Sequence, residues 1–346
     1  MYNDKLYVQF CLERNLKKNT KKCYESSLKS YTNFHEMTIS ELFNEALDDE
    51  QNIHLIKNRN IKRRMIDYRN YLLEQKNMTT STIKTYISKI RTFYSHFEIE
   101  IPDLPPVKYE RSYEINYLDL PTKEHIRKAI EISSLPIKAL ILFMSSSGTA
   151  RAETLSLKVE DFINGTYEYY TKNNLYEILE ELEKRNDIIP TLYLKRIKTD
   201  KYYYTFCSPE ASNYIVKYLK TRKNLKLTDK LFDFSNASVL TNFQKINDQM
   251  KWGFKGKYRF FRSHTLRKFH ASNLGIAAEY IDALQGRSKN KIHETYIKTN
   301  PEKLKKIYKE ALPNILIYKD QKNPAEIHED IHITINVFVS ENSYTL

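Results

Sequence analysis

The chain has 346 residues, 41% of them hydrophobic, which is enough apolar material for the cores of two domains. Only six residues are glycine, and none has the spacing of a glycine-rich nucleotide loop, so dinucleotide and P-loop sites are not expected. A formal net charge of +13 favours a polyanionic partner such as nucleic acid, with a merely lysine-rich composition as the alternative explanation.

The first hundred residues are predicted to be helical, because apolar residues recur there at helical spacing. Thr38 and Glu41 have the spacing of a capping box, which marks the start of one of these helices. The expected helices cover 5–14, 20–35, 38–47, about 61–76, and a segment that begins at Ser81.

Basic residues gather before and along the fourth and fifth of these helices. On a duplex they would contact phosphates, and the alternative is an ordinary solvated face. The candidate DNA-contacting residues are Lys57, Arg59, Lys62, Arg63, Arg64, Lys84, Lys89 and Arg91, and Arg69 lies in the same cluster.

Prolines at 102, 105 and 106 interrupt the helical pattern and predict a linker between two domains. Beyond it the pattern is again mainly helical, except for a pair of strands joined by a polar turn within 191–206 and a period-two strand pattern near the chain end. The sequence therefore predicts a mainly α protein with a small antiparallel β-sheet. The expected domains are 1–112, 113–312 and a C-terminal tail over 313–346.

Three short segments of the second domain carry the residues that point to a chemistry. They are GTARAETL over 148–155, HTLR over 264–267, and LQGR over 284–287 followed by HETY over 293–296. In this order and spacing they resemble the catalytic domain of the tyrosine recombinases, the phage-integrase superfamily. Two features depart from the common pattern of that family: threonine and alanine precede the first arginine, and Arg287 stands where many members have histidine or tryptophan. The Gln-Gly-Arg variant resembles integrases of archaeal viruses and plasmids.

The resemblance implies a site-specific DNA recombinase that breaks and rejoins DNA through a 3′-phosphotyrosine intermediate, in DNA integration or excision. It implies a helical core-binding domain ahead of the catalytic domain, a double-stranded DNA partner with attachment sites, and a homo-oligomer, a tetramer on synapsed DNA, with no cofactor and no metal. The strand pattern of the tail predicts that it adds to a sheet edge, either of a neighbouring protomer, with exchange of the tail between protomers, or of its own domain. The catalytic residues that the resemblance implies are Arg151, Lys198, His264, Arg267, Arg287 and Tyr296, with Lys201 as the alternative to Lys198.

The chemistry of these groups agrees with that assignment. Two guanidiniums, Arg151 and Arg267, can stabilise the extra negative charge of a pentacoordinate phosphate with bidentate bonds. Tyr296 would attack and retain the phosphate, while Lys198 protonates the leaving 5′-hydroxyl and His264 assists proton transfer. Two alternatives remain: a type IB topoisomerase, which shares the chemistry, and a DNA-binding protein with an inactive site.

The expected location is the cytoplasm of a prokaryotic host, in association with the nucleoid. No apolar run reaches the length of about 18 residues that a membrane span needs, and the N-terminal MYNDKLYVQF lacks the apolar core of a signal peptide. The three cysteines share no metal-binding spacing, which fits a reducing compartment.

Overall fold

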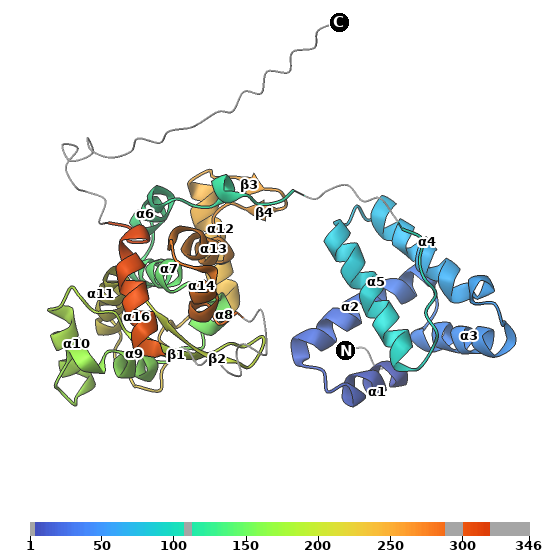
Figure 1. Cartoon of the computed structure of the whole chain (residues 1–346), viewed down its shortest axis with the longest axis horizontal. Helices are drawn as coiled ribbons and strands as arrows, with labels where there is room; N and C mark the ends of the chain where they lie inside the picture. The colour runs from blue at the N-terminus through green and yellow to red at the C-terminus, as the bar shows by residue number, and fades with distance from the viewer. Residues whose placement is uncertain (1–3, 107–112, 288–299, 319–346) are drawn as a thin grey trace, which may run out of the picture. The chain divides into compact units, whose positions relative to one another are not determined.

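The computed structural model describes residues 4–106, 113–287 and 300–318, and these residues are mainly helical with two short antiparallel sheets (Figure 1). The predicted fold class is confirmed. The chain divides into two compact units, Met1–Glu114 and Ile115–Leu346, each with its own hydrophobic core. None of the helices in the described ranges is long and apolar enough to cross a membrane.

The first unit contains the helices that the apolar periodicity predicts, and the capping box of Thr38 and Glu41 is present at the start of α3. Its core is rich in aromatic rings: Phe10 packs against Phe93 with ring centroids 5.3 Å apart, and Tyr31 meets Tyr68 edge-on at 5.1 Å. The elements are α1 (Lys5–Glu13), α2 (Lys18–His35), α3 (Ile39–Asn52), the 3-10 turn η1 (Ile56–Asn58), α4 (Asn60–Glu74) and α5 (Thr80–His96).

The second unit is built around one helix, α7 (Leu135–Ser147), which is apolar on all sides and packs against α11 (Pro209–Lys220) and α13 (Ser263–Asn273). A helix with no polar face is stable only when other elements cover it. Figure 1 shows α7 in the middle of this unit, with the other helices around it. The surrounding helices therefore hold the end of α7 in place, and with it the start of the segment that follows.

The predicted strand pair is present as β1 (Thr191–Lys195) and β2 (Tyr202–Phe206), which pair antiparallel with Thr191 opposite Phe206. A second hairpin, β3 (Phe254–Lys255) and β4 (Tyr258–Arg259), was not predicted, because strands of two residues are too short to show an alternating pattern. The remaining elements are η2 (Tyr117–Asp119), α6 (Lys123–Glu131), α8 (Arg151–Thr154), α9 (Val159–Gly165), η3 (Tyr167–Tyr169), α10 (Leu175–Glu183), α12 (Asn236–Gln249), α14 (Ala278–Leu284), α16 (Pro301–Ala311) and η4 (Leu312–Asn314).

The residues just after α16 belong to the core of the second unit, although the sequence places them in the tail. Ile315 and Ile317 are almost completely buried, and the Ile317 carbonyl accepts a hydrogen bond from Arg127 Nη2 at 2.7 Å. Glu210 accepts the backbone N–H of Ile317 at 2.9 Å. Any separate tail therefore begins after residue 318, and the strand pattern near the chain end lies outside the described residues.

Candidate active site

The first predicted arginine, Arg151, is the first residue of α8 and is half-buried. It follows a tight turn: Gly148 ends α7 with φ of 64°, a left-handed conformation that favours glycine. The turn is closed by Glu153, whose carboxylate accepts the Ala150 N–H at 3.0 Å. Within the described ranges the Arg151 guanidinium has no hydrogen-bond or ion-pair partner. No residue of the described ranges therefore occupies its donors.

The second predicted arginine, Arg267, is buried in α13 and holds separate segments together. Its Nη1 donates to the Gly148 carbonyl at 2.7 Å, and its Nη2 donates to the Gln285 carbonyl at 2.7 Å. The Glu153 carboxylate lies 3.7 Å from Nη1. Burial lowers the pKa of Arg267, while Glu153 opposes that effect. A guanidinium held in this way keeps its plane fixed and still has N–H groups left for a phosphate.

Glu153 both closes the start of α8 and binds a side chain of β2. Besides the Ala150 N–H, its Oε2 accepts the Tyr203 hydroxyl at 3.0 Å. Because Glu153 is 3% exposed and Tyr203 is 5% exposed, this carboxylate supplies a buried negative charge beside Arg267. Burial, together with Glu153, raises the pKa of Tyr203, so its hydroxyl stays protonated.

His264 lies three residues before Arg267, and this spacing places the two side chains on the same side of α13. Partial desolvation lowers the pKa of His264, and so do the nearby charges of Arg262 and Lys268. Arg267 and Arg287 act in the same direction. The imidazole is therefore neutral at neutral pH and can accept a proton or a hydrogen bond.

Arg287 directly follows the turn of Gln285 and Gly286 at the end of α14. Its N–H donates to the Asp282 carbonyl at 2.7 Å, and its guanidinium lies 3.9 Å from the Asp282 carboxylate. Arg287 stands two residues after Gln285, whose carbonyl Arg267 binds at 2.7 Å, and its charge contributes to lowering the pKa of both Arg267 and His264. Tyr296 lies outside the described residues.

Lys198 lies in the exposed turn between β1 and β2. Its ammonium has no partner in the part of the chain that the structure describes. Lys201, the alternative, stands directly before β2 and is half-buried.

Three further residues shape this site, and sequence reasoning missed the role of Arg196 among them. Gln285 Nε2 donates to the Arg267 carbonyl at 3.1 Å and lies 3.0 Å from His270 Nδ1. His270 is completely buried, which lowers its pKa to about 3 and keeps it neutral. The third is Arg196, whose Nη1 donates to the Gly286 carbonyl at 2.7 Å. Nothing in the local sequence distinguishes Arg196 from the other basic residues of the hairpin.

In the first unit, several of the candidate DNA-contacting residues are used internally. Arg59 is 8% exposed, and its Nη1 lies 3.2 Å from Glu50 and 3.1 Å from Glu100. Arg64 forms an ion pair with Glu45. Of the same candidates, Lys57, Arg63 and Lys84 are exposed, and Lys62, Lys89 and Arg91 are half-buried.

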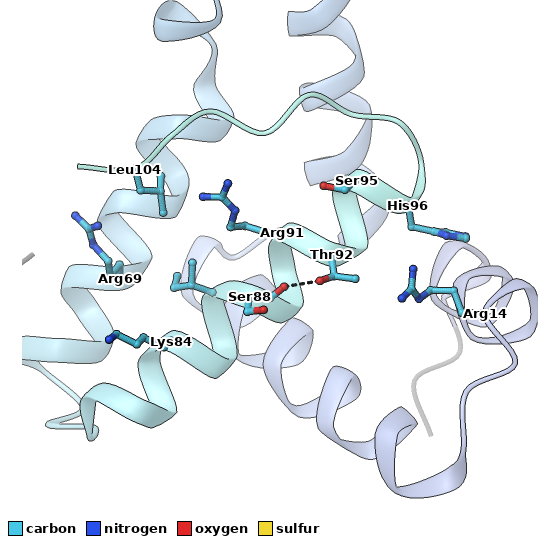
Figure 2. A pocket seen from close by; sticks show the side chains of 10 residues that line it. Arg14, Arg69, Lys84, Ser88, Arg91, Thr92, Ser95, His96 and Leu104 are labelled. Atoms are coloured by element: carbon cyan, nitrogen blue, oxygen red, sulfur yellow. Dashed lines mark hydrogen bonds between the residues drawn. The ribbon is translucent and has the colours of Figure 1, made fainter. Parts of the chain in front are cut away.

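A groove of about 520 Å³ runs along α5, and we call it the α5 groove. Figure 2 shows the charged ends of Arg69, Lys84 and Arg91 on one side of it, with Arg14 beside His96 farther along. A second hollow of about 620 Å³ continues along the same helix and shares Lys84 and Ser88 with the groove. The side chains that line the groove are Arg14, Arg69, Lys84, Ile87, Ser88, Arg91, Thr92, Ser95, His96 and Leu104, and none of them is acidic.

Comparison with known proteins gives a match in structure only: no family model matches the chain, and no curated protein is similar to it. The chain is similar to a lambda integrase dimer bound to a COC′ core site, at 14% identity and a TM-score of 0.53, over 85% of this chain and 96% of that one. It is also similar to XerA recombinase (17% identity, TM-score 0.37, 88% and 96% covered) and to the Tn1549 transposon integrase (14%, 0.46, 88% and 98%). The first comparison shows that the chain has the integrase fold, which confirms the resemblance at the level of the fold.

A substitution at Gly286 tests whether this turn packs against the Tyr203 ring. Gly286 has φ of 61°, and a Cβ there would lie 2.5 Å from the Tyr203 ring, so Gly286→Ala should meet both backbone strain and a clash. Gly253 has φ of 67° with no atom within 4 Å, so Gly253→Ala should meet the strain alone, about 1–2 kcal/mol. We expect Gly286→Ala to lower the free energy of unfolding of the second unit by about 1–3 kcal/mol more than Gly253→Ala.

The measurement is urea unfolding followed by the fluorescence of Trp252, the single tryptophan of the chain, which lies in the second unit. An equal decrease in the free energy of unfolding of Gly286→Ala and Gly253→Ala would mean that the Gly286 turn does not lie against Tyr203.

Proposed function

We propose that this chain is a tyrosine-type site-specific DNA recombinase. The observation that carries the proposal is the arrangement of Arg267, which is fixed by the Gly148 and Gln285 carbonyls beside His264 and Arg287, within the integrase fold. Concentrated positive charge suits a phosphodiester that gains negative charge as it reacts, and Arg151 adds to it because it stands three residues after Gly148, whose carbonyl Arg267 binds.

In the proposed reaction, the Tyr296 oxygen attacks the scissile phosphorus while the bond to the 5′-oxygen breaks. The phosphate stays on the tyrosine as a 3′-phosphotyrosine, so the bond energy is conserved for rejoining. Arg151 and Arg267 stabilise the non-bridging oxygens, and a neutral His264 takes up the tyrosine proton. Lys198 gives a proton to the departing 5′-oxygen, which leaves as a hydroxyl.

The partner in this proposal is double-stranded DNA, bound by more than one copy of the chain. The similar lambda integrase is a dimer on a core site. The first unit serves as the core-binding domain and Ile115–Ile317 as the catalytic domain. We further propose that residues 319–346 act between protomers. The Gln-Gly-Arg variant favours a mobile element of an archaeal host, with the protein bound to DNA in the cytoplasm.

Covalent trapping tests the proposal directly. Tyr296→Phe should abolish covalent adducts on a nicked suicide substrate while DNA affinity stays within about twofold, because only the nucleophilic oxygen is removed. The adducts are counted as slow-migrating protein–DNA bands on a denaturing gel. Persistent adducts would exclude Tyr296. Tyr308 could not replace it, since its ring is completely buried and its hydroxyl donates to the Ser146 carbonyl at 2.9 Å.

The general acid can be identified with a substrate whose leaving group needs no proton. Lys198→Ala should slow cleavage by about 10²–10⁴-fold on ordinary DNA and much less on DNA with a 5′-bridging phosphorothiolate. Lys201→Ala is the matched comparison in the same hairpin. An equal defect of Lys198→Ala on both substrates, with rescue of Lys201→Ala instead, would assign the acid to Lys201.

The α5 groove should contact the DNA backbone. The double change Lys84→Ala and Arg91→Ala removes two cations from the groove and should lower the dependence of log affinity on log salt by about two. Lys184→Ala with Arg185→Ala, on exposed residues at the end of α10, removes the same charge outside the first unit. Binding is measured by fluorescence anisotropy between about 50 and 200 mM salt. The same slope change in both double variants would mean that net charge, and not the groove, binds DNA.

A further inference from the structure

Arg196 closes the turn that carries Lys198. Its N–H donates to the Lys201 carbonyl at 2.7 Å, and its own carbonyl accepts from Asp200 at 2.8 Å and from Thr199 at 3.3 Å. The conformation of the turn therefore depends on where the Arg196 backbone is held.

The side chain of Arg196 reaches a different part of the chain. Its Nη1 donates to the Gly286 carbonyl at 2.7 Å and to the Gln285 carbonyl at 3.3 Å. The Gln285 carbonyl also accepts from Arg267 Nη2 at 2.7 Å. Two guanidiniums from different elements thus meet on the turn that directly precedes Arg287.

The hairpin touches this turn a second time through β2. The Tyr203 ring occupies the space where a Cβ of residue 286 would lie, at 2.5 Å. Meanwhile Arg196 Nε is buried without a partner in the described part of the chain. A buried donor is normally paired. Since Nε has no partner there, the hydrogen bonds of Nη1 to the two carbonyls determine how the guanidinium is oriented.

We propose that Arg196 is a positioning residue that fastens the turn of Lys198 to the turn of Arg287. The strands of this hairpin pack in the core of the second unit, but residues 197–200 of its turn are exposed. The turn therefore needs an attachment of its own if its lysine is to act on a fixed phosphate. The ion pair of Lys195 with Asp200, at 3.2 Å, lies within the hairpin and cannot supply one. In this proposal the role of Lys198 rests on the recombinase function, whereas the contact between the two turns does not.

Hydrogen exchange tests the fastening without reference to activity. In Arg196→Met the backbone amides of Thr199, Asp200 and Arg287 should exchange faster than in the native chain. Arg185→Met is the matched control, because Arg185 is exposed and is bonded to Asp187, outside both turns. Unchanged exchange at both turns in Arg196→Met would overturn the proposal.

Cleavage kinetics then test the link to Lys198. Arg196→Met should slow cleavage of ordinary DNA by about 10²-fold, as expected for a displaced catalytic group, and a 5′-bridging phosphorothiolate should restore most of the loss. Arg196→Lys keeps the charge but loses the planar fork, so its defect should be intermediate. DNA affinity should stay unchanged in Arg196→Met, Arg196→Lys and Arg185→Met.

An equal loss on both substrates would show that Arg196 does not act through Lys198, and would overturn that part of the inference. If the native chain formed no covalent adduct at all, the recombinase function would fail. The exchange comparison would still decide whether Arg196 joins the two turns.

Discussion

The candidate site depends on one buried side chain, Arg267, and on the two backbone carbonyls that it binds. The carbonyls of Gly148 and Gln285 come from the ends of α7 and α14, so a single guanidinium sets the distance between two loops. Backbone carbonyls are good partners for this purpose, since they carry no net charge and cannot neutralise the arginine. Glu153, at 3.7 Å, is the one carboxylate among the described residues recorded in an ion pair with Arg267. The result is a cation whose position is fixed and whose charge Glu153 offsets in part.

Sequence patterns predict the parts of this protein in which a local rule decides the structure. The helices of the first unit follow from apolar periodicity, and the strand pair of β1 and β2 follows from its aromatic run. The H-x-x-R motif also predicts that His264 and Arg267 lie on one side of a helix, and both residues lie in α13. The β3–β4 hairpin escapes prediction because its strands are shorter than one period of alternation.

The sequence does not predict which contacts a basic residue makes when its partner lies far away along the chain. Arg59 and Lys84 are equally basic, yet Arg59 is buried against Glu50 and Glu100, and Lys84 lines the α5 groove. The bond that fixes the role of Arg196 joins residues that are 90 positions apart. The residues on either side of such an arginine or lysine do not indicate its partner, because tertiary packing alone brings the two together. For the same reason, the core position of Ile315 and Ile317 was not expected from a segment that follows a helix-ending proline.

The electrostatics of the site suggest why so many of its contacts go to neutral groups. Arg267 is subject to the charges of Arg196 and Arg287, which lower its pKa together with burial, and the same surroundings keep His264 and His270 neutral. Adding carboxylates would relieve this repulsion, but it would also occupy the donors that a phosphate needs. Carbonyl acceptors hold the guanidiniums in place and leave the repulsion to be relieved by the anion itself. In the proposed reaction that relief would grow as negative charge builds on the phosphate, so the fixed cations would stabilise the transition state more than the bound substrate.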